Sequence, residues 1–257
     1  MVAAHKEFPM PQDKNLYMPV LVGATKNYKP GITYQRDDDG DNISSKNPNY
    51  NELTAVYWAW KNLKDVDAIG LVQYRRYFFK GGKRDIADVA TYGQFDQLLS
   101  KYDVILPRKR EYFIETNYSH YVHAHHKEPL DVMRQVVAEK YPSYLDSYDK
   151  VMKKTSAHMF NMFVMKSDYF DRYARFIFGV LFEVEKRVDI SDYTVQEARV
   201  FGYLSELLMD VWINENHINY TEMSVKQLGK RHYAKKLLNF LKRKFQKSGG
   251  NGTTTHF

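Results

Sequence analysis

One apolar segment that ends in an arginine pair constrains the fold more than any other feature of the chain. The run Ala68–Val72 has the composition of a buried strand, and it opens directly into residues 73–77, QYRRY. Arginine is almost never buried unless it is paired. The planar guanidinium of Arg75 or Arg76 matches phosphate oxygens in geometry and charge. The segment therefore predicts the floor of a site for a diphosphate ligand, with an exposed turn as the competing interpretation.

The sequence before this strand is unusually dense in polar side chains. Those that can make directional contacts are Asp41, Asn42, Ser44, Lys46, Asn47, Asn51, Glu52 and Thr54. An aromatic helix over 51–63 follows them and leads to the strand. The acidic run 37–41, DDDGD, could supply oxygen ligands to a divalent cation, but it lacks the calcium-loop pattern. A solvated acidic loop is the favoured interpretation of that run.

Strands and helices alternate along the chain. Apolar runs predict strands at 2–4, 16–24, 67–72, 103–107 and 158–165, and helices at 51–63, 95–100, 130–140, 144–154, 168–186 and 194–214. This alternation predicts an α/β domain with a mainly parallel sheet flanked by helices. Ligands of such sheets bind beyond the carboxyl ends of the strands. We therefore expect His5, the residues from Tyr74 to Tyr77 and those after Leu106 to share one rim.

The positive charge of the chain is concentrated near its C-terminus. The formal net charge is +7, and residues 223–247 contain nine basic side chains and no acidic one. Apolar residues share one helical face of this segment: Ala234, Leu237, Leu238, Leu241 and Phe245. The pattern predicts a basic amphipathic helix over 230–247 that lies on an anionic membrane surface. Docking of this stripe onto the protein itself is the alternative. We expect a catalytic domain over 1–222, this segment over 223–247 and a flexible tail over 248–257.

Several classes of function are disfavoured by what the sequence lacks. It has no cysteine, no G-x-S-x-G elbow, no P-loop and no G-x-G-x-x-G, so kinases, P-loop hydrolases and dehydrogenases are poor candidates. No basic groove or recognised module predicts nucleic-acid binding. No secretory signal and no long apolar span is evident. We therefore expect a cytoplasmic protein, peripheral at the inner face of the cell membrane.

Four histidines lie close together in HYVHAHH, at positions 120, 123, 125 and 126. The zinc-hydrolase spacing, with its intervening glutamate, is absent, so a metal cluster is the minor interpretation. Contacts to substrate hydroxyls are the other interpretation, and we expect His123 and His126 on the acceptor side of a site.

Four motifs, in the same order, resemble a family of bacterial capsular and exopolysaccharide glycosyltransferases. They are VAAHKEF at 2–8, DNISSKNPNYNELTAVYWAWKN at 41–62, IGLVQYRRYFF at 69–79 and HMFNMFVMKSDYFDRY at 158–173. The resemblance covers most of residues 2–215. It implies an A-type glycosyltransferase fold, a nucleotide-diphospho-sugar donor and a growing surface-polysaccharide acceptor. Relatives of this family resemble galactofuranosyltransferases that use UDP-galactofuranose.

This chain departs from the usual A-type pattern at the end of the central strand. A metal-binding Asp-x-Asp motif usually stands there, and here its place is taken by Gln73-Tyr74-Arg75-Arg76. Arginine charge could replace the cation, so we expect that no cofactor is required, and a divalent cation is the disfavoured alternative. The family also tends to show Glu-Arg-Leu where this chain has Glu206-Leu207-Leu208.

The resemblance and the residues together assign candidate roles. We expect Glu206 to act as the catalytic base, with Asp192 and Glu197 as rivals. The expected donor and diphosphate ligands are His5, Lys6, Asp41, Asn42, Glu52, Thr54, Gln73, Tyr74, Arg75, Arg76, Asn161 and Arg199. The alternative is a protein without catalytic activity, a carbohydrate-binding or scaffold component of a polysaccharide assembly complex.

Overall fold

The computed structural model describes residues 1–81 and 85–228. A nine-stranded sheet runs through these residues in the order β10-β6-β9-β4-β1-β2-β3, and β5 and β11 extend it from β4. Its strands are β1 (Val2–Ala4), β2 (Pro19–Leu21), β3 (Gln35–Arg36), β4 (Ala68–Gln73), β5 (Arg76–Phe78), β6 (Val104–Pro107), β9 (Phe163–Lys166), β10 (Tyr220–Met223) and β11 (Val225–Gln227). A small second sheet pairs β7 (Arg110–Glu111) with β8 (Ser156–Ala157).

The centre of the large sheet is parallel. Strand β1 pairs in parallel with both β2 and β4, and β2 pairs in parallel with β3. Strand β9 runs antiparallel between β4 and β6, while β10 pairs in parallel with β6. The prediction of an α/β fold with a mainly parallel sheet is confirmed. Because β1, β2 and β4 point the same way, the residues that follow them meet at one edge.

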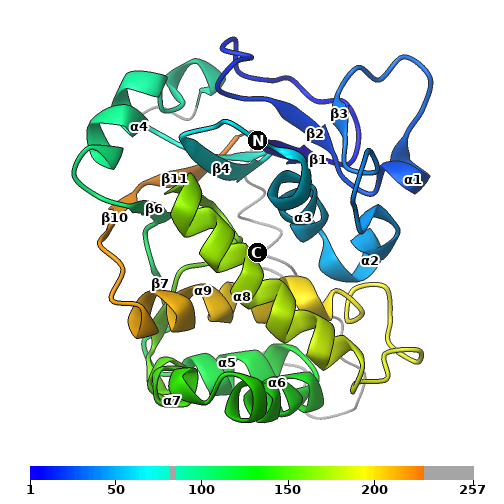
Figure 1. Ribbon diagram of the computed structural model, residues 1–257, viewed down its shortest axis with the longest axis vertical. Helices are drawn as coiled ribbons and strands as arrows, with labels where there is room; N and C mark the ends of the chain where they lie inside the picture. The colour runs from blue at the N-terminus through cyan, green and yellow to red at the C-terminus, as the bar shows by residue number, and fades with distance from the viewer. Residues whose placement is uncertain (82–84, 229–257) are drawn as a thin grey trace, which may run out of the picture.

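The helices are α1 (Ala24–Asn27), α2 (Asn47–Tyr50), α3 (Leu53–Asn62), α4 (Tyr92–Leu99), α5 (Asn117–Ala124), α6 (Lys127–Lys140), α7 (Leu145–Lys153), α8 (Ser167–Glu185) and α9 (Val200–Glu215). Helices α3, α8 and α9 pack on one face of the sheet, and α4 packs on the other (Figure 1). Side chains alternate between the faces, so Leu71 joins the first core and Val72 the second. Helices α5, α6 and α7 form a further layer against α8 and α9.

Two sequence expectations differ from the structure near the site. The strand expected over 158–165 begins only at Phe163, because Phe160 and Asn161 adopt left-handed backbone conformations with φ of 79° and 53°. The helix expected over 194–214 begins at Val200, after an irregular segment. Both differences put irregular backbone beside the sheet edge, where binding residues are commonly found.

The boundary expected after residue 222 falls inside the sheet. Strand β11 pairs with β5, so Val225–Gln227 are part of the α/β domain and not of a separate segment. The basic helix predicted over 230–247 and the tail over 248–257 lie outside the described residues. Within the described ranges, no helix has both the length and the apolar character that crossing a membrane requires.

A buried carboxylate organises the polar loop that precedes α3. Asp37 is fully buried, and it accepts hydrogen bonds from the backbone N–H groups of Gly23 and Ala24 at 2.7 and 2.9 Å. The hydroxyls of Ser44 and Thr54 donate to it as well, each at 2.5 Å. The acidic run therefore contributes a structural anchor in Asp37, which ties the end of β2 to the start of α3.

Asp37→Ala leaves these four donors without their acceptor. We expect the variant to lose about 3–5 kcal/mol of unfolding free energy, because buried unsatisfied donors are costly. The melting temperature should fall by about 10 °C, as measured by circular dichroism. Asp39→Ala is the matched control, since Asp39 is exposed and, among the residues that the structure describes, its side chain accepts a hydrogen bond only from Gln35. Equal melting temperatures for the two variants would contradict the anchoring role.

Candidate active site

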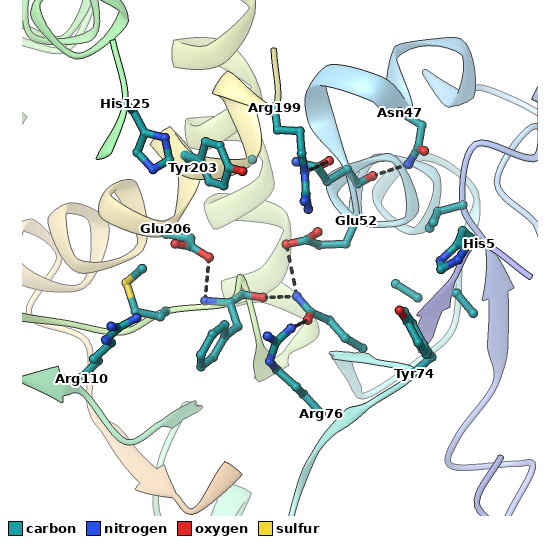
Figure 2. A pocket seen from close by; sticks show the side chains of 18 of the residues that line it. His5, Asn47, Glu52, Tyr74, Arg76, Arg110, His125, Arg199, Tyr203 and Glu206 are labelled. Carbon is teal, nitrogen blue, oxygen red and sulfur yellow. Dashed lines mark hydrogen bonds between the residues drawn. The ribbon is translucent and has the colours of Figure 1, made fainter. Parts of the chain in front are cut away.

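A pocket of about 530 Å³ opens at the carboxyl ends of β1 and β4. Its walls come from the residues after β1, the α2–α3 segment, the β4–β5 turn, the loop before β9, helix α5 and the first turns of α9. The side chains that line it include three arginines and two glutamates, which are labelled in Figure 2. This is the edge of the sheet that the sequence indicated.

Arg76 holds the floor of the pocket. Its Nη1 donates to Gln73 Oε1 at 2.6 Å, and its guanidinium carbon lies 4.5 Å from the centroid of the Phe160 ring. Burial lowers the pKa of Arg76, and the charges of Glu52 and Glu206 act in the opposite direction. Arginine keeps its proton throughout the accessible pH range. Arg76 is therefore a fixed, oriented cation at the end of the central strand.

Arg199 contributes a second cation from the opposite wall. It is the residue just before α9, and its Nε donates to Asn51 Oδ1 at 2.8 Å. Its charge is among the factors that lower the pKa of Arg76, as expected for two cations that face the same space. Figure 2 shows the two guanidinium groups on either side of Glu52. Two converging guanidinium groups favour an anion with several oxygens.

Glu206 lies on α9 and lines the pocket. In Figure 2 it stands between Arg110 at one end of the pocket and His5 at the other. Its Oε1 accepts a hydrogen bond from the backbone N–H of Phe160 at 2.9 Å. Burial, followed by the charge of Glu52, raises the pKa of Glu206 to about 8, against the opposing effects of that hydrogen bond, Arg76 and Arg199. A carboxyl group with a pKa near neutrality is suited to accept a proton during a reaction.

A buried amide holds the second glutamate. Asn161 Nδ2 donates to Glu52 Oε1 at 2.9 Å and to the carbonyl of Gly202 at 3.0 Å, while Ser205 donates to Asn161 Oδ1 at 2.7 Å. The left-handed conformations of Phe160 and Asn161 place one backbone N–H on Glu206 and the next side chain on Glu52. This turn therefore orients both carboxylates.

The structure brings together seven of the predicted site residues as pocket lining: His5, Glu52, Gln73, Tyr74, Arg76, Arg199 and Glu206. Asn161 lies behind this lining and acts through Glu52. Burial lowers the pKa of His5, and the neighbouring charges of Lys6 and Arg75 lower it further.

Five predicted donor ligands lie elsewhere. Arg75 is exposed and rests against the rings of Phe8 and Tyr74, and Lys6 is also exposed. Thr54 is buried on Asp37. The remaining two, Asp41 and Asn42, belong to the acidic loop. Asp41 accepts a hydrogen bond from the Tyr57 hydroxyl, and Asn42 donates to the backbone carbonyls of Asp38 and Gly40. The turn between β4 and β5 explains the arginine pair, because Arg75 lies in the exposed turn, whereas Arg76 begins β5 and pairs with Gln73.

The rival bases and the predicted acceptor-side histidines also lie outside the pocket lining. Asp192 is exposed, and Glu197 accepts hydrogen bonds from Thr194 and pairs with His126 at 3.3 Å. His123 pairs with Glu115 at 2.6 Å and is likewise exposed. His123 lies on α5 and His126 directly precedes α6, and neither side chain lines the pocket.

Several lining residues were not singled out from the sequence: Arg110, Met159, Phe160, Gly202 and Tyr203, together with His120 and His125 of the histidine cluster. The cluster was visible as HYVHAHH, but choosing among its members required the orientation of α5. Asn47 and Asn51 belong to the dense polar stretch and line the opposite wall.

The residues at the end of β4 do not fit a divalent cation. The side-chain oxygen that β4 offers at its end is Gln73 Oε1, and it accepts a hydrogen bond from the Arg76 guanidinium at 2.6 Å. A positive side chain at this position repels a metal ion. Among the described residues, no group of three or more His, Cys, Asp or Glu side chains is placed to hold one.

The chain is similar to a solved glycosyltransferase. It aligns with the apo structure of WbbM, described as a bifunctional glycosyltransferase, with 27% sequence identity and a TM-score of 0.76. The alignment covers 89% of this chain and 45% of that chain, so the present sequence spans less than half of WbbM. This likeness confirms the expected glycosyltransferase type of α/β fold. No functionally curated protein matches the sequence significantly.

A family model matches residues 1–217, which include every element from β1 to α9 and all of the pocket lining. The chain belongs to the family described as domain of unknown function DUF4422.

Proposed function

We propose that this protein is a glycosyltransferase that moves a sugar from a nucleotide-diphospho-sugar to an acceptor hydroxyl. The observation that carries the proposal is the convergence of Arg76, Arg199 and the raised-pKa carboxyl of Glu206 in one pocket at the carboxyl edge of the sheet. The similarity to WbbM supports the same reaction class. The role of each group follows from its charge and position.

In the proposed reaction, Arg76 and Arg199 bind the diphosphate. When the bond between the anomeric carbon and the phosphate oxygen breaks, negative charge develops on that oxygen. A cation already oriented by Gln73 and Phe160 stabilises this charge without reorganising. The arginines thereby perform the task that a metal ion performs in enzymes with an Asp-x-Asp motif.

Glu206 is the proposed general base. Its ionised carboxylate takes the proton of the acceptor hydroxyl as that oxygen forms its bond to the anomeric carbon. The nucleoside diphosphate leaves with the electron pair of the broken bond. Glu52 faces the same space and keeps the pKa of Glu206 high by charge repulsion.

For the donor we propose UDP-galactofuranose, and for the acceptor a growing capsular or other surface polysaccharide. These assignments rest on the resemblance of the four sequence motifs to galactofuranosyltransferases of that kind. The nucleotide would lie toward His5, Tyr74 and Asn47, which form the end of the pocket away from Arg110 (Figure 2). Contact of residues 230–247 with an anionic membrane stays a prediction from the sequence.

UDP release from a panel of UDP-sugars tests the reaction and the role of the arginines together. We expect release to be fastest with UDP-galactofuranose and to change less than twofold when EDTA is added, because Arg76 supplies the positive charge. Strict loss of release in EDTA would contradict the substitution of arginine for metal. Absence of release with every donor, in the presence of saccharide acceptors, would favour the carbohydrate-binding alternative.

A further inference from the structure

The pocket continues beyond Glu206, away from the end that faces β1. Figure 2 shows His125 and Arg110 on one side of Glu206, His5 and Tyr74 on the other, and Tyr203 above Glu206 beside His125. His120 and Met159 also line the pocket, and both contact Tyr112, whose ring lies 5.6 Å from the guanidinium carbon of Arg110. Glu206, the proposed base, therefore stands between two compartments of the pocket. The diphosphate and nucleotide occupy the compartment near His5 in the proposed reaction, and the compartment near His125 and Arg110 is left for another group.

Two histidines in the wall of this second compartment are each stacked on a tyrosine, and of the two tyrosines Tyr203 also lines the pocket. His125 stacks on Tyr203 with ring centroids 4.1 Å apart and 24° between the planes. His120 stacks on Tyr112 at 3.9 Å and 23°. His120, His125 and Tyr203 are half-buried and line the pocket. Stacking fixes the orientation of each ring, so the compartment has rigid aromatic walls.

These walls match the chemistry of a saccharide. A sugar ring carries apolar C–H groups on its faces and hydroxyls at its rim, so it needs aromatic surface and polar groups at the same time. Aromatic side chains supply apolar area with a polar tip, and imidazole nitrogens donate or accept hydrogen bonds. The guanidinium of Arg110 adds donors at the same end of the pocket.

Adjacent residues provide an internal comparison. His126 also stacks on a tyrosine, Tyr193, at 4.0 Å and 20°, but neither ring lines the pocket. The two pairs have the same composition and nearly the same geometry. His125 and Tyr203 line the pocket beside Glu206, whereas His126 and Tyr193 do not. Substitutions at His125 and His126 can therefore distinguish loss of saccharide binding from loss of aromatic packing.

We propose that His120, His125, Tyr203 and Arg110 form the acceptor subsite and that it takes the terminal saccharide of the acceptor. This proposal rests on the proposed glycosyl transfer and adds the substrate class and the residues that select it. In this arrangement the saccharide hydroxyl approaches the anomeric carbon from the face opposite the leaving diphosphate, as direct displacement requires, and Glu206 takes its proton.

The test separates donor binding from acceptor use. UDP binding is measured by calorimetry, and sugar transfer from UDP-galactofuranose is measured with octyl glycosides of galactose, glucose, mannose and rhamnose as acceptor probes. For His125→Ala we expect the acceptor KM to rise about tenfold and the UDP Kd to change less than twofold. His125→Phe should recover most of the loss because it restores the aromatic surface, and His126→Ala should resemble the wild type.

Other outcomes overturn the proposal in distinguishable ways. Equal acceptor KM values for His125→Ala and His126→Ala would contradict the proposed subsite, while the proposed transfer reaction would still hold. A wild-type protein that binds UDP and releases it from the donor, but glycosylates none of the four glycosides, would contradict the saccharide assignment. A protein that neither binds UDP nor releases it would instead remove the proposed function.

Discussion

Arg76→Ala is expected to lower kcat for sugar transfer by about 10²–10³-fold, the usual cost of removing one oriented group that stabilises charge in a transition state. The physical reason is that the developing charge on the diphosphate loses the cation that Gln73 and Phe160 hold in place. Arg76→Lys keeps the charge but not the planar fork, so an intermediate loss is expected. Steady-state kinetics with UDP-galactofuranose measures both variants.

The neighbouring arginine is the matched control. Arg75 has the same chemistry and adjoins Arg76 in the chain, but it is exposed and contacts Phe8 and Tyr74 outside the pocket lining. Arg75→Ala should therefore retain near-normal kcat. The reverse pattern, with a large loss for Arg75→Ala and none for Arg76→Ala, would be incompatible with the proposed clamp.

Glu206→Gln is expected to lower kcat by about 10²–10⁴-fold, the range for loss of a general base. The wild-type rate should also depend on pH in a defined way. Because the pKa of Glu206 is raised to about 8, the carboxyl is mostly protonated at pH 7 and cannot accept the acceptor proton. The value of kcat/KM should thus rise about tenfold per pH unit below pH 8 and level off above it.

Stability measurements show whether Glu206→Gln remains folded. The pKa of Glu206 is raised from 4.5 to about 8 in the folded state. Its contribution to stability is therefore full below pH 4.5 and is lost as the pH rises to about 8. Glutamine avoids this loss, so at pH 7 the variant should melt at the same temperature as the wild type or higher. A variant that stays folded and keeps near-normal turnover would rule out Glu206 as the base.

The central strands followed from the sequence because they are short apolar runs between polar segments, whereas β3, β10 and β11 contain mainly polar residues and were not predicted. Ala68–Val72 was recognisable as a buried strand. Of the residues after it, Gln73, Tyr74 and Arg76 line the pocket, whereas Arg75 is exposed and Tyr77 is buried in the core. Which arginine faces the pocket could not be derived, because that depends on the pairing of β4 with β5 at Gln73 and Arg76.

Two further features depended on tertiary structure. HMFNMFVM has the composition of a strand, yet Phe160 and Asn161 take left-handed conformations to orient Glu52 and Glu206. Local propensity gives no sign of such a turn, because its stabilising contacts come from distant elements. The structural role of Asp37 in the acidic loop was likewise not predictable from the sequence. It is recognised from the four hydrogen-bond donors that converge on its carboxylate.

The most direct test of the central claim is mass spectrometry of an octyl glycoside acceptor after incubation with UDP-galactofuranose in EDTA. The account predicts that wild-type protein adds one hexose to the glycoside and produces an equal amount of UDP. It also predicts that Arg76→Ala and Glu206→Gln, shown to be folded, add almost none in the same time. Equal hexose addition by both variants and the wild type would contradict the assignment of the reaction to this pocket.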